Sequence, residues 1–400
     1  MMHRQIFCEL FIMATSLLLL TSAQGTWRNE TFAFQHPGVL LSRTQLDFIR
    51  DRVAAGDQPW TLAYADMTGE TLAALSRKPG TVPVVESGPF STPDIGCAQE
   101  RSDAAASYLN ALRWVIEGKQ EHADKAIQYL DDWSATLTGH SNVNAGLQAA
   151  WSASVWTRAA EIIRHTNAGW SEASITRFEK LMRDVYLPQV STNTDKGMNW
   201  ELVLISASLN IGVFLSSPEI FTSALDRLLL WAPSFAYLRT DGPIPRPPPF
   251  LTNTTNTTLL TNYWGGQTTF PADGITTETC QEFKRVGYGI TAISHALETA
   301  YHQGIDLWSG SDLGRRLQAA SDFNIEQADA ASVPAWLCEG RGVDGTDIGG
   351  TTEVLLNAMH NRLGVQMWKM ESHTNRNRPM GANYLSLAWE TLTHAGWPVE

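Results

Sequence analysis

The chain has 400 residues and a formal net charge of −12 at pH 7, and 43% of its residues are hydrophobic. This charge argues against nucleic acid or a membrane surface as the partner, and the hydrophobic content with 15 Trp argues against disorder. An acidic polysaccharide stays compatible with the charge, because local basic clusters such as Lys284-Arg285 and residues 369–378 can dominate a groove.

Residues 1–25 have the pattern of a secretory signal peptide, with a basic start, an apolar run and small residues that suit a signal peptidase. The apolar run is too short for a transmembrane helix, so no membrane association is expected. We predict a secreted, extracellular protein whose residues 26–400 form a single domain. Three glycosylation motifs agree with secretion, at Asn29, Asn253 and Asn256.

Cysteine numbers limit the disulfide pairing. Without Cys8 of the signal peptide, the chain keeps Cys97, Cys280 and Cys338, which allow at most one internal disulfide. We predict Cys97–Cys338, because Cys280 lies within a motif that carries several polar residues.

Apolar residues at three-to-four spacing predict helices through most of the chain, whereas strand-like alternation is absent. Short connections between such helices indicate antiparallel helix hairpins. We predict an all-α fold, an (α/α) toroid or incomplete barrel, and a monomer; a linear α-solenoid is the alternative. The predicted helices are 44–54, 103–117, 122–136, 146–165, 171–187, 200–215, 218–232, 278–303, 307–324 and 353–363.

The predicted helix 278–303 carries the most informative pattern. Its helical spacing places four polar residues on one side, opposite an apolar stripe. A carboxylate, an amide, a guanidinium and a phenol together indicate a functional face, made by Glu278, Gln281, Arg285 and Tyr288. Gly287 and Gly289 flank the tyrosine and predict that another segment packs closely there.

Two further segments carry amide side chains that suit a saccharide. Asn144, Gln148 and Trp151 follow one another at i, i+4 and i+7, a pattern that fits sugar hydroxyls and a stacked ring; a core Trp beside two capping amides is the alternative. Asn199 precedes an apolar segment, where it is either a helix N-cap or an amide donor aimed at a carboxylate.

The predicted helix 353–363 places Glu353, Asn357 and His360 on one face, with Arg362 off that face. The spacing is not a metal signature, and the sequence has no compact His/Cys cluster. No metal ion or cofactor is therefore expected. Motifs of serine hydrolases and of phosphate-binding loops are also absent.

Several motifs in series resemble the alginate lyase domain family, which are polysaccharide lyases with an α/α toroid fold. Four segments of this chain resemble the central signature of that family: Tyr263-Trp264, residues 270–274, residues 278–280 and Tyr288-Gly289. Residues 197–200, 353–364 and 391–395 look like further family segments, in the right order.

This chain departs from the family pattern at several positions. Many members have Arg-Asp and then His where this chain has Gln281-Glu282 and Arg285, and Asn-His-Tyr where it has Asn357-Ala-Met359. The departures imply a different uronate, and the chain is closest in character to secreted fungal glucuronan and mannuronan lyases.

The resemblance implies β-elimination on a 4-linked polyuronate, without a cofactor. It makes Tyr288 the base and acid, with Arg285 lowering the pKa of Tyr288 or binding the substrate carboxylate. Asn199 and His360 would complete the neutralisation of that carboxylate. Tyr263 is the reserve catalytic tyrosine. The remaining substrate-binding residues are Trp264, Trp200, Gln148, Trp151, Asn144, Glu278, Gln281 and Arg362.

Two other classes fit the sequence. One is a glycoside hydrolase on a similar ring of helices, with paired carboxylates such as Asp273 and Glu282. The other is a protein that binds an acidic polysaccharide without cutting it. A lyase makes an unsaturated product that absorbs in the near ultraviolet, a hydrolase makes reducing ends without that absorbance, and a binding protein makes neither.

Overall fold

Helices make up most of the described chain, as the sequence predicted. Serine side chains cap three of them, where Ser42, Ser171 and Ser217 each accept a hydrogen bond from the backbone N–H three residues on. The helices are α2 (Arg43–Ala55), α3 (Trp60–Gly69), α4 (Cys97–Glu117), α5 (Gln120–Thr136), α6 (Ala145–His165), α7 (Glu172–Leu181), α8 (Leu187–Val190), α9 (Met198–Phe214), α10 (Pro218–Trp231), α11 (Thr257–Tyr263), α12 (Phe283–His302), α13 (Leu307–Gly310), α14 (Leu313–Asp329), α15 (Glu353–Leu356), α16 (Trp368–Asn377) and α17 (Glu390–His394).

This computed structural model describes residues 32–253, 257–330, 332–341, 343, 347–383, 385 and 387–398. The predicted signal peptide and the glycosylation motifs at Asn29 and Asn256 lie outside these residues, while Asn253 is exposed. Residues 35–400 form one compact unit, to which the following description refers. Among the described residues, no helix has the length and apolar character needed to cross a membrane.

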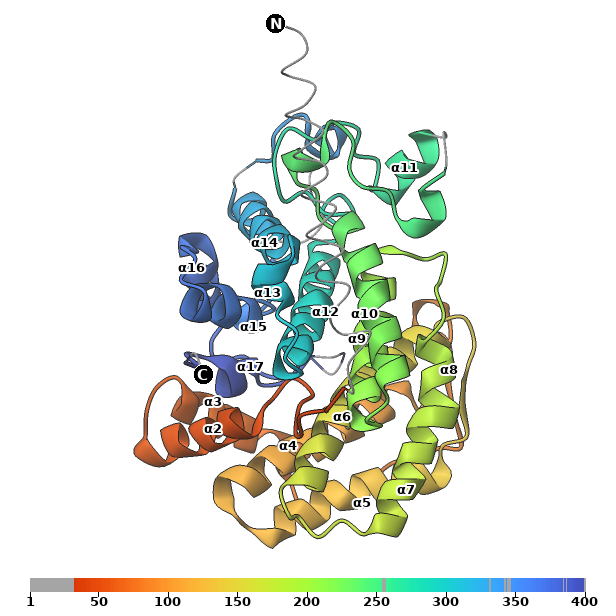
Figure 1. The fold of residues 1–400 in the computed structure, drawn as a ribbon, viewed down its shortest axis with the longest axis vertical. Helices are drawn as coiled ribbons and strands as arrows, with labels where there is room; N and C mark the ends of the chain where they lie inside the picture. The colour runs from red at the N-terminus through yellow and green to blue at the C-terminus, as the bar shows by residue number, and fades with distance from the viewer. Residues whose placement is uncertain are drawn as a thin grey trace, which may run out of the picture. The chain divides into compact units, whose positions relative to one another are not determined.

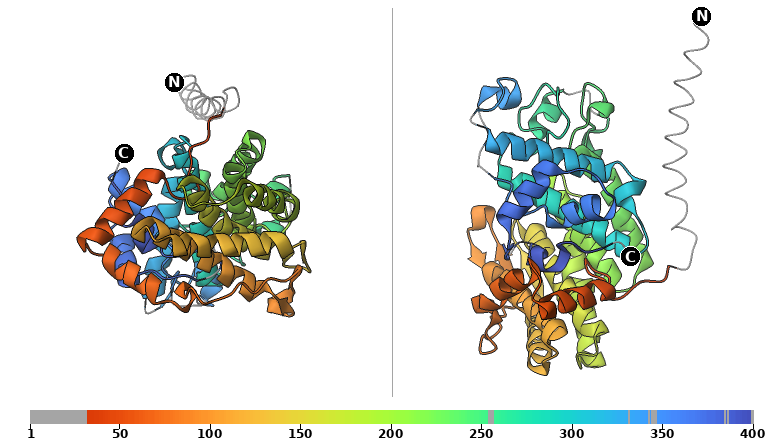
Figure 2. Two further views of the ribbon diagram at one scale, coloured as in Figure 1. Left: turned by 90° about the horizontal axis from the view of Figure 1, so that it is seen from below. Right: turned by 90° about the vertical axis from the view of Figure 1, so that its left-hand side faces the viewer.

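The helices of this unit close into a ring, which confirms the predicted α/α toroid. Helix α4 packs on α6, α6 on α9, and α9 on α12. The ring continues from α12 through α15 to α17, and α17 packs on α2, which contacts α4. The C-terminal helices therefore lie beside the red N-terminal helices (Figures 1 and 2). The contact between α2 and α17 distinguishes this ring from a linear solenoid.

Helices α9 and α12 run in the same direction. At their beginnings, Asn199 on α9 contacts Glu278 in the turn that precedes α12. Toward their ends, Thr299 on α12 donates a 3.2 Å hydrogen bond to the side chain of Asn210 on α9.

Helices α6 and α9 are also parallel. Gly146 at the start of α6 lies beside Leu204 in the first half of α9. At the other end, the Arg164 guanidinium donates to the carbonyl oxygen of Phe214. The N-termini of α6, α9 and α12 therefore share one end of the unit, and their C-termini share the other.

Close packing explains the two glycines of α12. A Cβ on Gly287 would lie 2.2 Å from the carbonyl oxygen of Ile348, and one on Gly289 would lie 2.3 Å from the ring of Phe235. Both distances are far below van der Waals contact, so no other residue fits without a shift of the neighbouring segments. The predicted close approach at these positions is confirmed.

The sequence missed a small sheet and several short helices. Strand β1 (Val84–Ser87) pairs antiparallel with β2 (Asp94–Ile95) and parallel with β3 (Gly139–Ser141), with Val85 opposite His140. Strands of two to four residues are too short to show a period-two pattern. The helices that were not predicted are α3, α11, α16 and α17, of which α11 and α17 are only seven and five residues long.

Candidate active site

The turn before α12 replaces the first part of the predicted helix. The helix begins at Phe283, so Glu278 and Gln281 do not continue the helical face of Arg285 and Tyr288. The physical reason is that residues 275–277 pair with another backbone segment, through Tyr237 N–H to Ile275 O and Thr277 N–H to Phe235 O. This pairing holds the segment extended, and a turn then leads into the helix.

A disulfide fixes the same turn. Cys280 is bonded to Cys338, 58 residues further on. The predicted Cys97–Cys338 pairing is wrong, because Cys97 is a buried free thiol that lies near the carbonyl oxygen of Glu86. The disulfide therefore anchors Cys280, which lies two residues after Glu278.

Asn199 and Glu278 form the central polar pair. The Asn199 side-chain amide donates a 2.6 Å hydrogen bond to Glu278 Oε1, and the Asn199 backbone N–H lies 3.3 Å from the same oxygen. The N-cap alternative for Asn199 is wrong, since Gly197 is the N-cap of α9 and its φ of 62° is disfavoured for other residues. One N–H of the Asn199 amide is engaged by Glu278, which leaves the other for a ligand.

Glu278 is buried, with only 1% of its surface exposed. Burial raises the pKa of its carboxyl, while hydrogen bonds from Asn199 and the nearby charge of Arg285 lower it; burial dominates. The second oxygen, Oε2, has no hydrogen-bond partner among the described residues. Glu278 thus orients the Asn199 amide from the protein interior, and its own carboxylate is not accessible to a substrate.

Gln281 and Tyr263 secure the start of α9. The Gln281 amide lies 3.2 Å from the Met198 sulfur and donates to the carbonyl oxygen of Thr277. The Tyr263 hydroxyl accepts the Met198 backbone N–H at 3.3 Å and lies 3.4 Å from Ser234 Oγ. Tyr263 is 6% exposed, and burial raises its pKa to about 12. This tyrosine has the surroundings of a core residue.

Tyr288 lies one turn after Lys284 and Arg285, on the half-exposed face of α12. Burial raises the pKa of Tyr288, and the charges of Lys284 and Arg285 lower it by less. The sequence led us to expect a lowered pKa, so this expectation is wrong in direction: the cations are present, but burial outweighs them. Arg285 also pairs with Glu282 at 3.0 Å, which reduces its effect.

The three tryptophans that were predicted to bind substrate differ in exposure. Trp264 is 1% exposed and packs in a core cluster with Phe270, so it offers no ring face to a sugar, and its predicted substrate-binding role is wrong. Trp200 is partly exposed, with the Lys196 ammonium 5.4 Å from its ring centroid. Trp151 is also partly exposed and lies 5.9 Å from the guanidinium of Arg101.

A second polar cluster surrounds the start of α6. Gln148 is fully buried, accepts a hydrogen bond from Arg101, and donates to Glu100 Oε2 at 2.6 Å. Glu100 also binds His140 at 2.9 Å and Tyr186 at 2.5 Å. Gln148 is therefore an interior network residue, and its predicted direct contact with a sugar is contradicted by its burial.

The Asn144 amide donates to the Gly88 carbonyl oxygen at 2.7 Å and makes no side-chain cap, although Asn144 occupies the N-cap position of α6. Arg101, Asn144 and Trp151 are partly exposed in this region. Spacing along the sequence did not reveal Arg101, because it lies on α4 and meets the other residues only through packing of α4 on α6.

His360 and Arg362 lie elsewhere, which corrects their predicted site roles. His360 Nδ1 lies 2.8 Å from the carbonyl oxygen of Val365 within a local turn. Arg362 makes two hydrogen bonds of 2.9 and 2.8 Å to Glu298 and lies 3.7 Å over the ring of Tyr301. Glu298 lies ten residues along α12 from Tyr288, roughly 15 Å at 1.5 Å per residue. A local hydrogen bond explains His360, and the buried ion pair with Glu298 explains Arg362.

The two carboxylates of the hydrolase alternative are engaged by cations. Glu282 pairs with Arg285 at 3.0 Å, and Asp273 lies 3.5 Å from the Arg239 side chain and accepts its backbone N–H at 2.6 Å. The site therefore offers amide, cation and phenol groups in place of a carboxylate pair.

Comparison with known proteins agrees with the toroid fold. Residues 77–246 match the family model described as alginate lyase, a range that includes Gln148, Trp151 and Asn199. No curated protein matches the sequence. Among solved structures, alginate lyase A1-III from Sphingomonas species A1 has a TM-score of 0.62 at 16% identity, over 92% of this chain and 99% of that one.

Two further structures are similar. A substituted form of alginate lyase A1-III complexed with tetrasaccharide has a TM-score of 0.62 at 17% identity, over 92% of this chain and 98% of that one. An alginate lyase from Bacteroides ovatus has a TM-score of 0.55 at 13% identity, over 90% and 99% of the two chains. These identities are low, so the likeness itself shows the toroid fold.

The toroid and the family match together define this protein as a polysaccharide lyase. The family model matches residues 77–246, and the toroid fold shared with solved alginate lyase A1-III extends over 92% of the chain.

Proposed function

We propose that the protein cleaves a 4-linked polyuronate, β-glucuronan or polymannuronate, by β-elimination. One observation carries the proposal: the Asn199–Glu278 pair lies at the N-terminal end of α9, beside the turn that leads to Lys284, Arg285 and Tyr288. The N-termini of α6, α9 and α12 meet at this end, and helix N-termini favour anions. A chain of uronate carboxylates has the complementary charge.

The reaction sets three tasks. The C5 proton of a uronate is weakly acidic while its carboxylate is ionised, so donors must stabilise the charge that develops there. A base removes the C5 proton as the C4=C5 double bond forms, and an acid protonates O4 as the C4–O4 bond breaks. The free N–H of Asn199 and the guanidinium of Arg285 suit the first task.

Tyr288 suits both proton transfers. In β-linked glucuronan and mannuronan, H5 and O4 lie on the same side of the C4–C5 bond, so one residue can take the first proton and return it to O4. Tyr288 is favoured over Tyr263 because it is half-exposed beside two cations, whereas Tyr263 is buried and engaged by Met198. Tyr263 supports the fold of the site.

The proposed platforms for further sugar units are Trp200 with the neighbouring Lys196, and Trp151 with the neighbouring Arg101. Each pair combines a ring that stacks on a pyranose with a cation for its carboxylate. Asn144 lies at the same end of α6 and belongs to the proposed binding surface. We also propose a secreted enzyme, since residues 1–25 fit a signal peptide and the Cys280–Cys338 disulfide suits an oxidising compartment.

The test is to incubate the purified protein with glucuronan, polymannuronate and polyguluronate and to follow near-ultraviolet absorbance. We expect absorbance to rise with glucuronan or polymannuronate, and to rise less with polyguluronate, where H5 and O4 lie on opposite sides. No rise with any of the three would contradict the proposed substrate class.

A further inference from the structure

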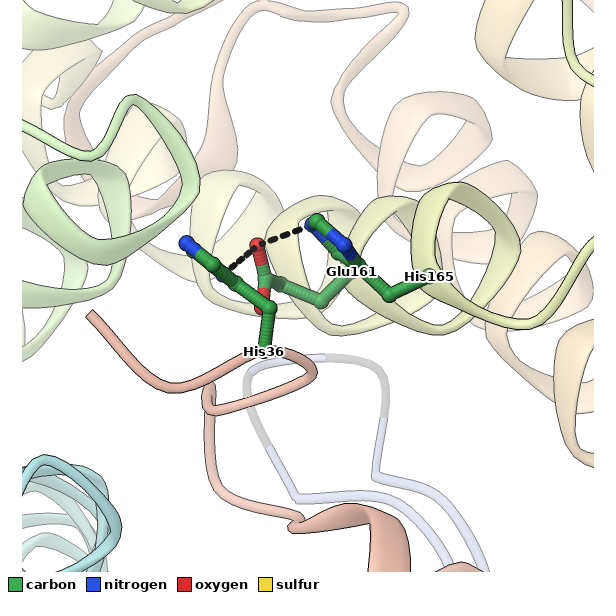
Figure 3. A group of neighbouring side chains, drawn as sticks. All are labelled: His36, Glu161 and His165. Carbon is green, nitrogen blue, oxygen red and sulfur yellow. Dashed lines mark hydrogen bonds and ion pairs between the residues drawn. The ribbon is translucent and has the colours of Figure 1, made fainter. Parts of the chain in front are cut away.

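The opposite end of the parallel helices carries a cluster that the elimination chemistry does not use. Glu161 and His165 lie one turn apart near the C-terminus of α6, and His36 approaches them from the segment that precedes α2 (Figure 3). His36 and Glu161 are 125 residues apart in the sequence. Spacing could not predict the cluster, which explains why no metal site was expected from the sequence.

We propose that His36, Glu161 and His165 form a binding site for a divalent transition-metal ion of the Zn²⁺ type. Two imidazoles and one carboxylate are a common ligand set for Zn²⁺, with water in the fourth position. The ion would attach the segment around His36 to α6 and thereby secure the point where the chain enters the ring.

The distances between ligand atoms suit one ion. Two ligand atoms about 2.1 Å from a tetrahedral Zn²⁺ lie roughly 3.4 Å apart. Here Glu161 Oε1 lies 3.2 Å from His36 Nδ1 and 3.7 Å from His165 Nε2. The three ligand atoms all lie within 4.8 Å of one another.

Outer contacts orient two of the ligands, as is usual around protein-bound metals. His36 Nε2 lies 3.0 Å from Ser216 Oγ, which leaves Nδ1 directed at Glu161. Glu161 Oε2 accepts the Gly38 backbone N–H at 2.9 Å. Ser216 lies just beyond α9, so the support comes from a third segment of the ring.

His165 supplies an independent observation. Its Nε2 is buried yet has no hydrogen-bond partner among the described residues, and a buried polar atom in this state costs about 1–3 kcal/mol. The rings of His36 and His165 are stacked, with centroids 4.4 Å apart and planes 9° apart. Because the rings are nearly parallel, the nitrogen lone pairs of His36 and His165 do not point at one common position. Metal binding therefore requires the His165 ring to rotate, and its side chain is 26% exposed.

The electrostatic surroundings favour a cation. The C-termini of α6 and α9 lie at this end, and helix C-termini carry partial negative charge. The neighbouring Arg164 is paired with Glu179 at 2.8 Å. The 17 residues that separate Ser216 from Asn199 correspond to roughly 25 Å of helix, which separates this cluster from the proposed active site.

The experiment uses tag-free full-length protein, stripped with chelator and titrated with Zn²⁺ or, for comparison, Mg²⁺. We expect one bound Zn²⁺ per chain by elemental analysis after dialysis, a higher thermal midpoint with Zn²⁺, and no such rise with Mg²⁺. In His165→Ala and in His36→Ala, Zn²⁺ affinity should fall at least tenfold and the Zn²⁺-dependent rise in midpoint should disappear.

Glu179→Gln is the matched control, because it removes a neighbouring carboxylate without touching the three ligands. It should bind Zn²⁺ like the unaltered protein. Two histidine variants keep the test decisive if one of them fails to fold. Less than stoichiometric Zn²⁺ in the unaltered protein, or binding that survives loss of either histidine, would overturn the proposal.

Discussion

The Asn199 amide donates a 2.6 Å hydrogen bond to the buried Glu278, and this contact joins the first turn of α9 to the turn before α12. A carboxylate accepts hydrogen bonds only, so Glu278 directs the nitrogen of the Asn199 amide and excludes the flipped orientation. The second N–H of the amide is thereby aimed in a fixed direction, as neutralisation of a substrate carboxylate requires.

Removing either partner tests this relationship. Asn199→Ala should lower kcat by roughly 10²–10³-fold, the usual effect of losing one donor to a developing negative charge. Glu278→Gln should lower kcat/KM by roughly 10–100-fold, because a hydrogen bond to a charged group contributes about 1.5–3 kcal/mol. Steady-state kinetics on the best uronate measures both.

Glu282→Gln is the control for Glu278→Gln, since it changes an exposed carboxylate close by. It should reduce activity much less. Equal losses in the two variants would mean that charge near α12, and not orientation of Asn199, controls the rate.

The pH dependence should report the surroundings of Tyr288. Burial raises the pKa of Tyr288 and Lys284 lowers it. A tyrosine base acts when deprotonated, so kcat/KM should rise with pH below that pKa. Lys284→Met removes the lowering charge and should move the rising limb of the profile to higher pH.

Lys369→Met serves as the control for the pH experiment, because Lys369 pairs with Glu326 on α14. Its profile should match that of the unaltered protein. A profile of Lys284→Met that does not shift would show that Tyr288 is not the titrating group.

Arg362 should contribute to stability and not to binding. Its pairing with Glu298 lowers the pKa of that carboxyl to about 2. A lowered carboxyl pKa stabilises the fold above the ordinary value near 4.5, and this contribution is lost as pH falls toward 2. Arg362→Met should cost about 3–5 kcal/mol in the free energy of unfolding at neutral pH, with KM unchanged.

Chemical denaturation and kinetics on the folded fraction measure the two effects of Arg362→Met. An increase in KM without loss of stability would restore the substrate-binding role that the sequence had suggested.

The disulfide should matter for both stability and activity. Closing a loop of 58 residues stabilises a fold by about 4 kcal/mol in the chain-entropy model. Cys280→Ser with Cys338→Ser should therefore lower the thermal midpoint, and should lower kcat because Cys280 lies in the turn that holds Glu278. Cys97→Ser, at the free thiol, should leave kcat unchanged.

Periodicity predicted the long helices because each buries a continuous stripe. The helix predicted over 146–165 is observed at Ala145–His165, and that over 218–232 at Pro218–Trp231. Short elements such as β2 escaped because two residues carry no period. The start of α12 was misplaced because pairing with residues 235–237 and the disulfide, which are distant in sequence, decide the conformation of residues 275–282.

The sequence predicted the relative placement of site residues that lie on the same helix. Arg285 and Tyr288 share the exposed side of α12, as their spacing indicated. Trp264 and Gln148 are buried, which the sequence did not predict. The identity of a polar or aromatic residue does not tell which side of its element packs inward. The contact of Asn199 with Glu278 arises from helix packing, which spacing does not encode.

The most direct test of the account compares Tyr288→Phe with Tyr263→Phe in the elimination assay, with the unsaturated product followed by absorbance. The account predicts that Tyr288→Phe abolishes product formation while the protein stays folded. Tyr263→Phe should keep measurable activity, because it loses only the contacts to Met198 and Ser234. Full activity in Tyr288→Phe, with loss in Tyr263→Phe, would contradict the assignment and make Tyr263 the base.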